Sequence, residues 1–95
     1  MIHVLADVSI EDLPRFVGVF ATRGAELRGK HGSRRSQVFR VRDEGQRLIV
    51  LFEWESKEAF EDFLADASTR EAMKASGTTA PPTFTLLEKV GEFPS

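Results

Sequence analysis

Two residues near the start of the chain, His3 and Asp7, have side chains that can transfer protons. Residues 2–8 alternate in polarity, which is typical of a strand, and the alternation places both residues on the same face. In apolar surroundings the pKa of the Asp7 carboxyl would rise, and the carboxylate would act as a base near neutral pH. His3 would then share the proton transfer. The alternative is that Asp7 ends the strand in water and helps to cap the next helix, with His3 half-exposed at the sheet edge.

Most other catalytic and metal-binding chemistry is excluded by the residue types. The chain has no cysteine, so disulfides, thiolate nucleophiles and cysteine-ligated zinc or iron–sulfur sites are ruled out. The two histidines are not spaced as a ligand pair, and His31 lies in a glycine-flanked segment that we expect at the surface. No serine–histidine–aspartate set, phosphate-binding glycine loop or zinc-protease motif occurs. We therefore expect no metal site and none of the common hydrolase sites.

The composition is that of a folded globular protein. Of the 95 residues, 41% are hydrophobic and 29% are charged, and the formal net charge is −2. Arginines gather in residues 23–47 and acidic residues follow in residues 53–66, without the interleaved aromatic residues that stack on bases. We interpret these charges as solvated faces and expect no nucleic-acid partner.

The cellular location is predicted from two features of the sequence. The first residues, MIHVLADVSIED, have neither the basic start nor the small-residue cleavage site of a signal peptide. No apolar run approaches the roughly 18 residues that a membrane span needs. We therefore expect a cytoplasmic protein that does not associate with membranes.

The first half of the chain predicts a strand, a helix and a hairpin. Between residues 13 and 27 an apolar residue recurs every three or four positions, which predicts a helix that begins near Pro14 and stops at Gly29 or Gly32. Ser9 or Asp12 can cap it. The following hairpin pairs strands at 36–42 and 47–54 across a turn at 43–46, in which Gly45 can adopt a positive φ.

The second half predicts two helical segments and a final strand. Ser56 is a good N-cap for a helix over residues 57–67, and a kink there leads to a further helical piece that carries Met73. The loop at 77–82 precedes a strand at 83–90. The chain therefore reads as one domain spanning residues 1–95.

The order β-α-β-β-α-β predicts an α+β fold of the ferredoxin-like type, with a four-stranded antiparallel sheet and the helices on one face. The strand at 47–54 is apolar on both faces, which indicates that it is covered from both sides. An uncovered apolar sheet face would be an adhesive patch in a monomer. We therefore predict a homodimer in which two sheets pack face to face.

The junction WESKEA at residues 54–59, together with the element order, points to a family. It resembles the W-x-S-x-E-A signature of the antibiotic biosynthesis monooxygenases, a branch of the dimeric α/β-barrel superfamily. The resemblance implies a cofactor-independent monooxygenase that oxidises a small phenolic or quinol-type compound with O₂ in a dry pocket between helices and sheet. Asp7 and His3 would then be catalytic. The residues implied to bind substrate are Leu5, Phe16, Phe20, Phe60, Phe63 and Met73.

Two other functions are compatible with this fold. One is a non-catalytic dimeric α/β-barrel protein that binds a small apolar molecule. The other is haem binding or degradation, which the resemblance disfavours: the haem-degrading members place an asparagine near Asp7, a second tryptophan near Phe63 and the iron-binding histidine near Met73. All three residues differ here.

Overall fold

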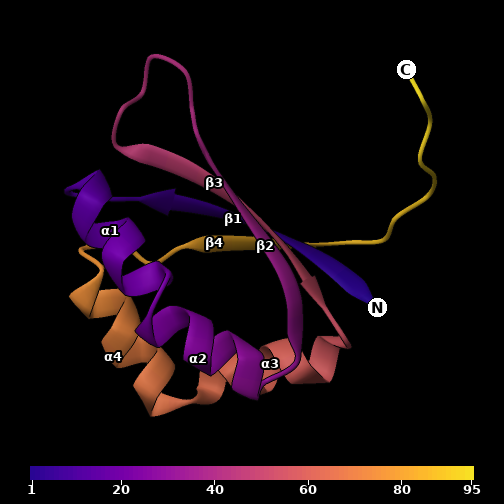
Figure 1. Ribbon diagram of the computed structural model, residues 1–95, viewed down its shortest axis with the longest axis horizontal. Coiled ribbons are helices and arrows are strands. Elements are labelled where there is room, and N and C mark those ends of the chain that lie inside the picture. The colour runs from indigo at the N-terminus through magenta and orange to yellow at the C-terminus, as the bar shows by residue number, and fades with distance from the viewer.

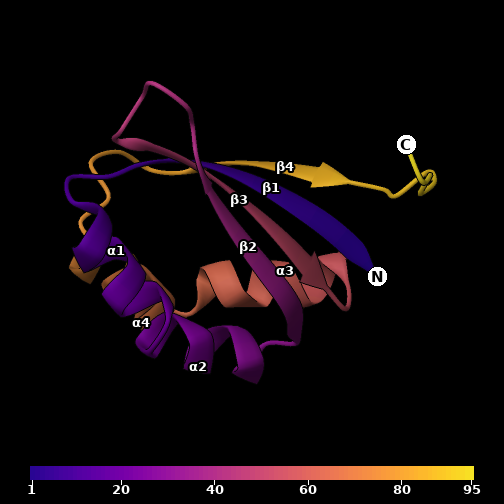
Figure 2. The same cartoon turned by 45° about the horizontal axis from the view of Figure 1, so that its top comes forward.

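The computed structural model describes residues 1–95, and its elements follow the predicted order. They are β1 (Ile2–Ser9), α1 (Leu13–Phe20), α2 (Arg23–Lys30), β2 (Ser33–Arg40), β3 (Arg47–Trp54), α3 (Lys57–Ala65), α4 (Ala67–Ala75) and β4 (Thr83–Leu87). The four strands form one antiparallel sheet in the order β2-β3-β1-β4. All four helices cover the same face of this sheet (Figures 1 and 2). The predicted ferredoxin-like α+β fold is confirmed.

The core lies between this sheet face and the helices, and the two-residue period of the central strands explains its composition. β1 pairs with β3 along its whole length, from Ile2 opposite Trp54 to Ser9 opposite Arg47. Side chains of a strand point alternately to its two faces, so one set of each strand meets the helices. That set is fully or almost fully buried. It comprises Val4, Ala6 and Val8 of β1 and Leu48, Val50, Phe52 and Trp54 of β3.

Both predicted helical regions are divided into two helices. The kink predicted near residue 67 is confirmed, because Asp66 ends α3 and its side chain caps α4 by accepting a hydrogen bond from the Ser68 amide. The single helix predicted from near Pro14 to Gly29 or Gly32 was wrong, since the chain breaks between α1 and α2. At the break the Thr22 hydroxyl donates to the Gly18 carbonyl at 2.7 Å, and such local bonds favour departure from helical geometry.

The N-caps of α1 and α3 are residues that the sequence predicted as caps. The Asp12 carboxylate accepts a hydrogen bond from the Arg15 amide at 2.9 Å and caps α1, and the Ser56 hydroxyl accepts one from the Ala59 amide at 3.1 Å and caps α3. After α2 the chain turns through Gly32 at a φ of 90°, a conformation that suits glycine.

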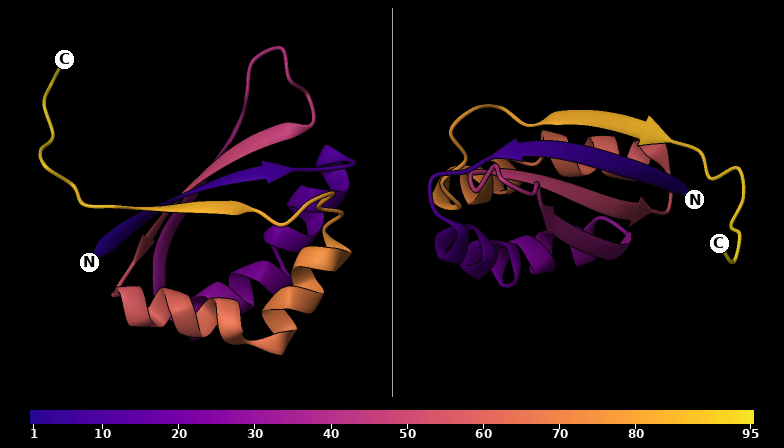
Figure 3. Two further views of the ribbon diagram at one scale, coloured as in Figure 1. Left: turned by 180° about the vertical axis from the view of Figure 1, so that it is seen from behind. Right: turned by 90° about the horizontal axis from the view of Figure 1, so that it is seen from above.

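Two strands have different bounds from those predicted. β2 ends at Arg40 because the turn already begins at Val41, whose carbonyl accepts a hydrogen bond from the Glu44 amide. The positive φ in this turn belongs to Asp43, at 68°, and not to Gly45. β4 ends at Leu87 because that residue pairs with His3, close to the start of β1, and few partner residues remain beyond it. The last residues lead away from the domain (Figure 3).

The segment after α2 is more enclosed than predicted. His31 was expected at the surface, but only 16% of its side chain is exposed. Its Nε2 lies 2.8 Å from Oδ2 of Asp66, and its ring meets the edge of Phe63. This contact ties the end of α2 to the α3–α4 junction. None of the four helices combines the length and the apolar character that crossing a bilayer requires.

Candidate functional site

A cavity of about 70 Å³ lies between the helices and the sheet. Its floor is the helix-facing side of β1, β3 and β4, and its walls come from α1 and α2 on one side and from α3, α4 and the segment before β4 on the other. The lining is predominantly apolar. It consists of Ala6, Val8, Phe16, Val19, Phe20, Gly24, Leu27, Arg28, Val50, Phe52, Phe63, Thr69, Ala72, Met73, Ser76, Thr78, Pro82 and Phe84.

Aromatic rings form one side of the cavity. Phe16 stacks on Phe20 with ring centroids 5.3 Å apart, and Phe20 lies 6.2 Å from Phe52 on the sheet. The helical spacing of Phe16 and Phe20 puts both on the inward face of α1. A flat ring entering from the helix side would therefore find aromatic faces and edges to pack against.

Trp54 packs against the aromatic residues of the cavity wall but does not itself line the cavity. It is fully buried at the end of β3, and its ring centroid lies 4.8 Å from that of Phe63 and 5.5 Å from that of Phe60. Its indole Nε1 has no hydrogen-bond acceptor. The tryptophan of the WESKEA junction thus works as packing that fixes the position of Phe63.

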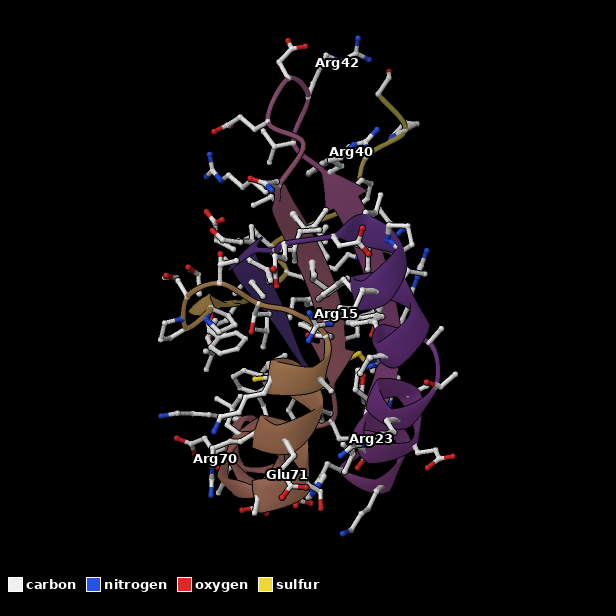
Figure 4. All side chains as sticks on the ribbon, turned by 90° about the vertical axis from the view of Figure 1, so that its left-hand side faces the viewer. Arg15, Arg23, Arg40, Arg42, Arg70 and Glu71 are labelled. Carbon is white, nitrogen blue, oxygen red and sulfur yellow. The ribbon has the colours of Figure 1, made fainter.

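Ion pairs and hydrogen bonds hold the helices around the cavity (Figure 4). Arg15 of α1 donates from Nε to the carbonyl of Ala75, at the end of α4, at 2.9 Å. Arg23 of α2 lies 3.8 Å from the carboxylate of Glu71 on α4. These contacts join the two walls across the helix layer.

Four of the residues implied to bind substrate line the cavity: Phe16, Phe20, Phe63 and Met73. Phe60 does not. It is buried one layer deeper, with its ring centroid 5.2 Å from that of Phe84 and 5.5 Å from that of Trp54. Phe60 and Phe63 are both buried residues of α3, but only Phe63 lines the cavity.

The predicted position of His3, Leu5 and Asp7 was wrong. They alternate with Val4 and Ala6, which face the helices, and therefore lie on the opposite, open face of the sheet. Asp7 accepts two hydrogen bonds from Arg47 there, at 2.8 and 3.1 Å, and these bonds lower the pKa of its carboxyl below the ordinary value. A carboxylate in this setting is a weak base, and its surroundings are polar rather than apolar.

Arg28, the one charged residue that lines the cavity, was not among the predicted site residues. Its guanidinium carbon lies 3.7 Å from the centroid of the Phe20 ring, and burial lowers its pKa to about 10. It remains protonated at neutral pH. Its spacing in the sequence does indicate its position, because Arg28 follows Phe20 and Gly24 at four-residue intervals and so shares their helix face. An arginine in a basic segment is, however, usually assigned to the solvated face.

Three hydroxyl groups complete the lining. Ser76 and Thr78 both donate to the Met73 carbonyl, at 2.6 and 3.1 Å. Thr69 is only 2% exposed, and its Oγ1 has no hydrogen-bond partner. No aspartate, glutamate or histidine lines the cavity. The site therefore offers aromatic packing, one cation and one free hydroxyl, and it can hold a compact aromatic molecule with a polar or anionic substituent.

Comparison with known proteins gives related structures across the whole chain. SnoaB, a cofactor-independent oxygenase from Streptomyces nogalater, superposes with a TM-score of 0.78 and 21% identity, over 99% of this chain and 97% of that one. A Mycobacterium tuberculosis protein, Rv0793, has a TM-score of 0.67 and 16% identity, over 96% of both chains. These similarities establish the shared fold. No curated protein sequence matches the chain.

The family itself is identified by the sequence. A family model described as antibiotic biosynthesis monooxygenase matches residues 1–75, which include the β1 strand, the WESKEA junction and all four helices. The chain therefore belongs to the antibiotic biosynthesis monooxygenase family.

Proposed function

We propose that this protein is a cofactor-independent monooxygenase that oxidises a small phenolic or quinol-type aromatic compound with O₂. The observation that carries the proposal is the apolar cavity between the helices and the sheet, walled by Phe16, Phe20, Phe63 and Met73. Membership of the family and the likeness to an oxygenase of the same fold support it. Such a cavity excludes bulk water from a reactive carbanion and leaves apolar space for O₂.

The reaction balances without an external reductant. A phenol loses its hydroxyl proton, and the electron-rich ring carbon opposite the oxygen attacks O₂. One oxygen atom stays on that carbon as a carbonyl, while the other leaves as water with the carbon-bound hydrogen and the phenolic proton. The substrate supplies all four electrons and becomes a quinone. The protein has to bind, orient and desolvate the substrate for this sequence.

The size of the cavity limits the substrate. A water molecule needs roughly 10–15 Å³ of such volume, so a cavity of about 70 Å³ holds about five to seven positions of that size. One six-membered ring takes up most of this volume. We therefore propose a substrate with a single ring.

The open face of the sheet supports the proposal of a homodimer. Apolar side chains gather there between polar ones, and Phe39 and Leu87 are 48% and 38% exposed. The face includes His3, Leu5, Asp7, Arg35, Gln37, Phe39, Ile49, Leu51, Glu53, Thr83, Thr85 and Leu87. A second copy packed sheet to sheet would remove these apolar groups from water.

Oxygen consumption with a panel of phenols and hydroquinones tests the proposed reaction, with ¹⁸O₂ to follow the inserted atom. Ala72→Leu adds bulk to the cavity wall, whereas Ala25→Leu makes the same change at an exposed position of α2. We expect one ¹⁸O atom in the quinone product, loss of turnover in Ala72→Leu and normal turnover in Ala25→Leu. Equal turnover in the two variants would place the reaction outside this cavity.

Binding without catalysis is the second candidate, and one observation favours it. No carboxylate or imidazole lines the cavity, so no side chain there can accept a proton from a bound phenol near neutral pH. Ligand binding without oxygen consumption over the whole panel would establish this alternative.

A further inference from the structure

Arg28 differs from the other arginines of the helix layer in having neither an ion pair nor a side-chain hydrogen bond; Arg70, for example, donates to the carbonyls of Leu64 and Ala65. Arg15 pairs with Glu11 and Arg23 pairs with Glu71. For Arg28, burial alone accounts for the lowered pKa, and no ion pair or hydrogen bond contributes. Its contact is with the face of Phe20, at 3.7 Å. A partly buried cation that keeps all its N–H donors free is poised to bind an anion.

The surroundings of Arg28 keep its guanidinium at the cavity. Placing a charge beside apolar side chains is unfavourable, and the Phe20 ring offsets only part of this penalty. Gly24, one helical turn earlier, provides the necessary space: a Cβ atom there would lie 2.9 Å from Nη1 of Arg28. The absent side chain at Gly24 and the ring of Phe20 thus direct the cation to the cavity wall.

A second group in the cavity also lacks a partner. The Thr69 hydroxyl, on the α4 wall, is buried and makes no hydrogen bond, although an unsatisfied hydroxyl in such a place destabilises the fold. The cavity therefore contains an unpaired cation and an unpaired hydroxyl within an otherwise apolar lining. A ring that carries one oxyanion and one further polar substituent would satisfy both.

We propose that Arg28 is the specificity-determining residue of the cavity and selects ring compounds bound as phenolates, with Thr69 as the second polar contact. This inference rests on the function proposed above and names the ionisation state in which the substrate binds. Since no aspartate, glutamate or histidine lines the cavity, the phenolic proton goes to solvent as the anion binds. Arg28 stays protonated throughout and stabilises the negative charge that the ring then transfers to O₂.

Equilibrium binding of two analogues of similar size, of which only one can ionise, tests the inference without any turnover. 4-Nitrophenol ionises near neutral pH and its two forms absorb at different wavelengths, whereas 4-nitroanisole has nearly the same shape and cannot ionise. We expect the wild-type protein to bind the phenolate about 10- to 100-fold more tightly than the anisole, as a charge-assisted hydrogen bond would give. The absorbance should also show that bound 4-nitrophenol ionises at lower pH than the free compound.

Arg28→Met is the decisive variant, and Arg42→Met, at an exposed position in the turn after β2, is its control, since Arg42 does not line the cavity. Arg28→Met should abolish the preference for the phenolate and leave anisole binding intact, whereas Arg42→Met should keep the preference. Arg28→Lys should keep part of it, because the charge remains but the planar fork is lost. Retained anisole binding also shows that the variants fold.

The outcomes separate this inference from the proposed function. If both compounds bind equally well to the wild-type protein and to Arg28→Met, the selection by Arg28 is refuted while the aromatic cavity stands. If neither compound binds to the wild-type protein, both the cavity as a substrate site and the selection by Arg28 are refuted.

Discussion

Replacing Thr69 with valine should stabilise the protein, because the native hydroxyl is buried without a partner. Oγ1 of Thr69 makes no hydrogen bond, and the residue is 2% exposed. An unsatisfied buried polar group costs about 1–3 kcal/mol, and valine has nearly the same shape with a methyl group in place of the hydroxyl. Threonine and valine have similar helix propensities, so the position in α4 adds little.

We therefore expect the free energy of unfolding of Thr69→Val to rise by about 1 kcal/mol or more. For a domain of this size each 1 kcal/mol raises Tm by roughly 4–8 °C. Thermal and urea unfolding, followed by the fluorescence of Trp54, the sole tryptophan, measures both quantities. The stabilised variant should bind the phenolate less tightly if Thr69 is the second polar contact.

Thr78→Val is the matched control. Thr78 lines the same cavity, but its hydroxyl donates to the Met73 carbonyl at 3.1 Å. Loss of that bond should destabilise the protein by about 0.5–1.5 kcal/mol. If Thr69→Val were as destabilising as Thr78→Val, the Thr69 hydroxyl would have a hydrogen-bond partner in solution, and the reasoning from an unsatisfied group would be refuted.

Three further predictions concern the open sheet face, the α3–α4 junction and the aromatic core. Leu51→Arg places a charge on the open face and should convert a dimer to a monomer in sedimentation velocity; an unchanged sedimentation coefficient would exclude the sheet-to-sheet dimer. Hydrogen bonds from His31 and the Ser68 amide, together with the nearby Lys30 ammonium, lower the pKa of Asp66 from 3.8 to about 2, so the stability that the charge provides is present above pH 3.8 and is lost as the pH falls toward 2. Asp66→Asn should therefore flatten the pH dependence of the urea midpoint in this window, whereas Asp62→Asn, at an exposed position, should not. Phe60→Ala should reduce the free energy of unfolding by about 3–5 kcal/mol, and a loss under 1 kcal/mol would contradict the close packing of Phe60 on Trp54.

Local rules account for most of the secondary structure. The alternation in β1, the stripe in α3 and the caps at Asp12 and Ser56 are properties of short segments, and the structure reproduces them. The end of β4 depends on a neighbouring strand instead, because β1 has few residues left to pair with it. The break after α1 is local, since the Thr22 hydroxyl donates to the Gly18 carbonyl four residues earlier, but the continuous apolar spacing did not indicate it.

The candidate site, too, was predictable from the sequence only in part. The inward positions of Phe16, Phe20, Phe63 and Met73 follow from helical spacing, and the sequence indicated them. The face of β1 that meets the helices was assigned from the family resemblance, although the wholly apolar set of Val4, Ala6 and Val8 was the better indicator of the buried face. The face of a strand with more apolar side-chain area is the one that packs against the helices, and the face of β1 with His3 and Asp7 has less apolar area than the face with Val4, Ala6 and Val8.

The sequence by itself determined the order of the elements, the antiparallel sheet with helices on one face and the family, because periodicity, capping and the WESKEA junction are all local patterns. Only the tertiary structure decided which side chains share the cavity. Arg28 and Thr69 are 41 positions apart and come together there because α2 and α4 pack side by side over the same sheet face. Whether a charge or a hydroxyl is left without a partner depends on every neighbour in space, and a linear pattern does not contain that information.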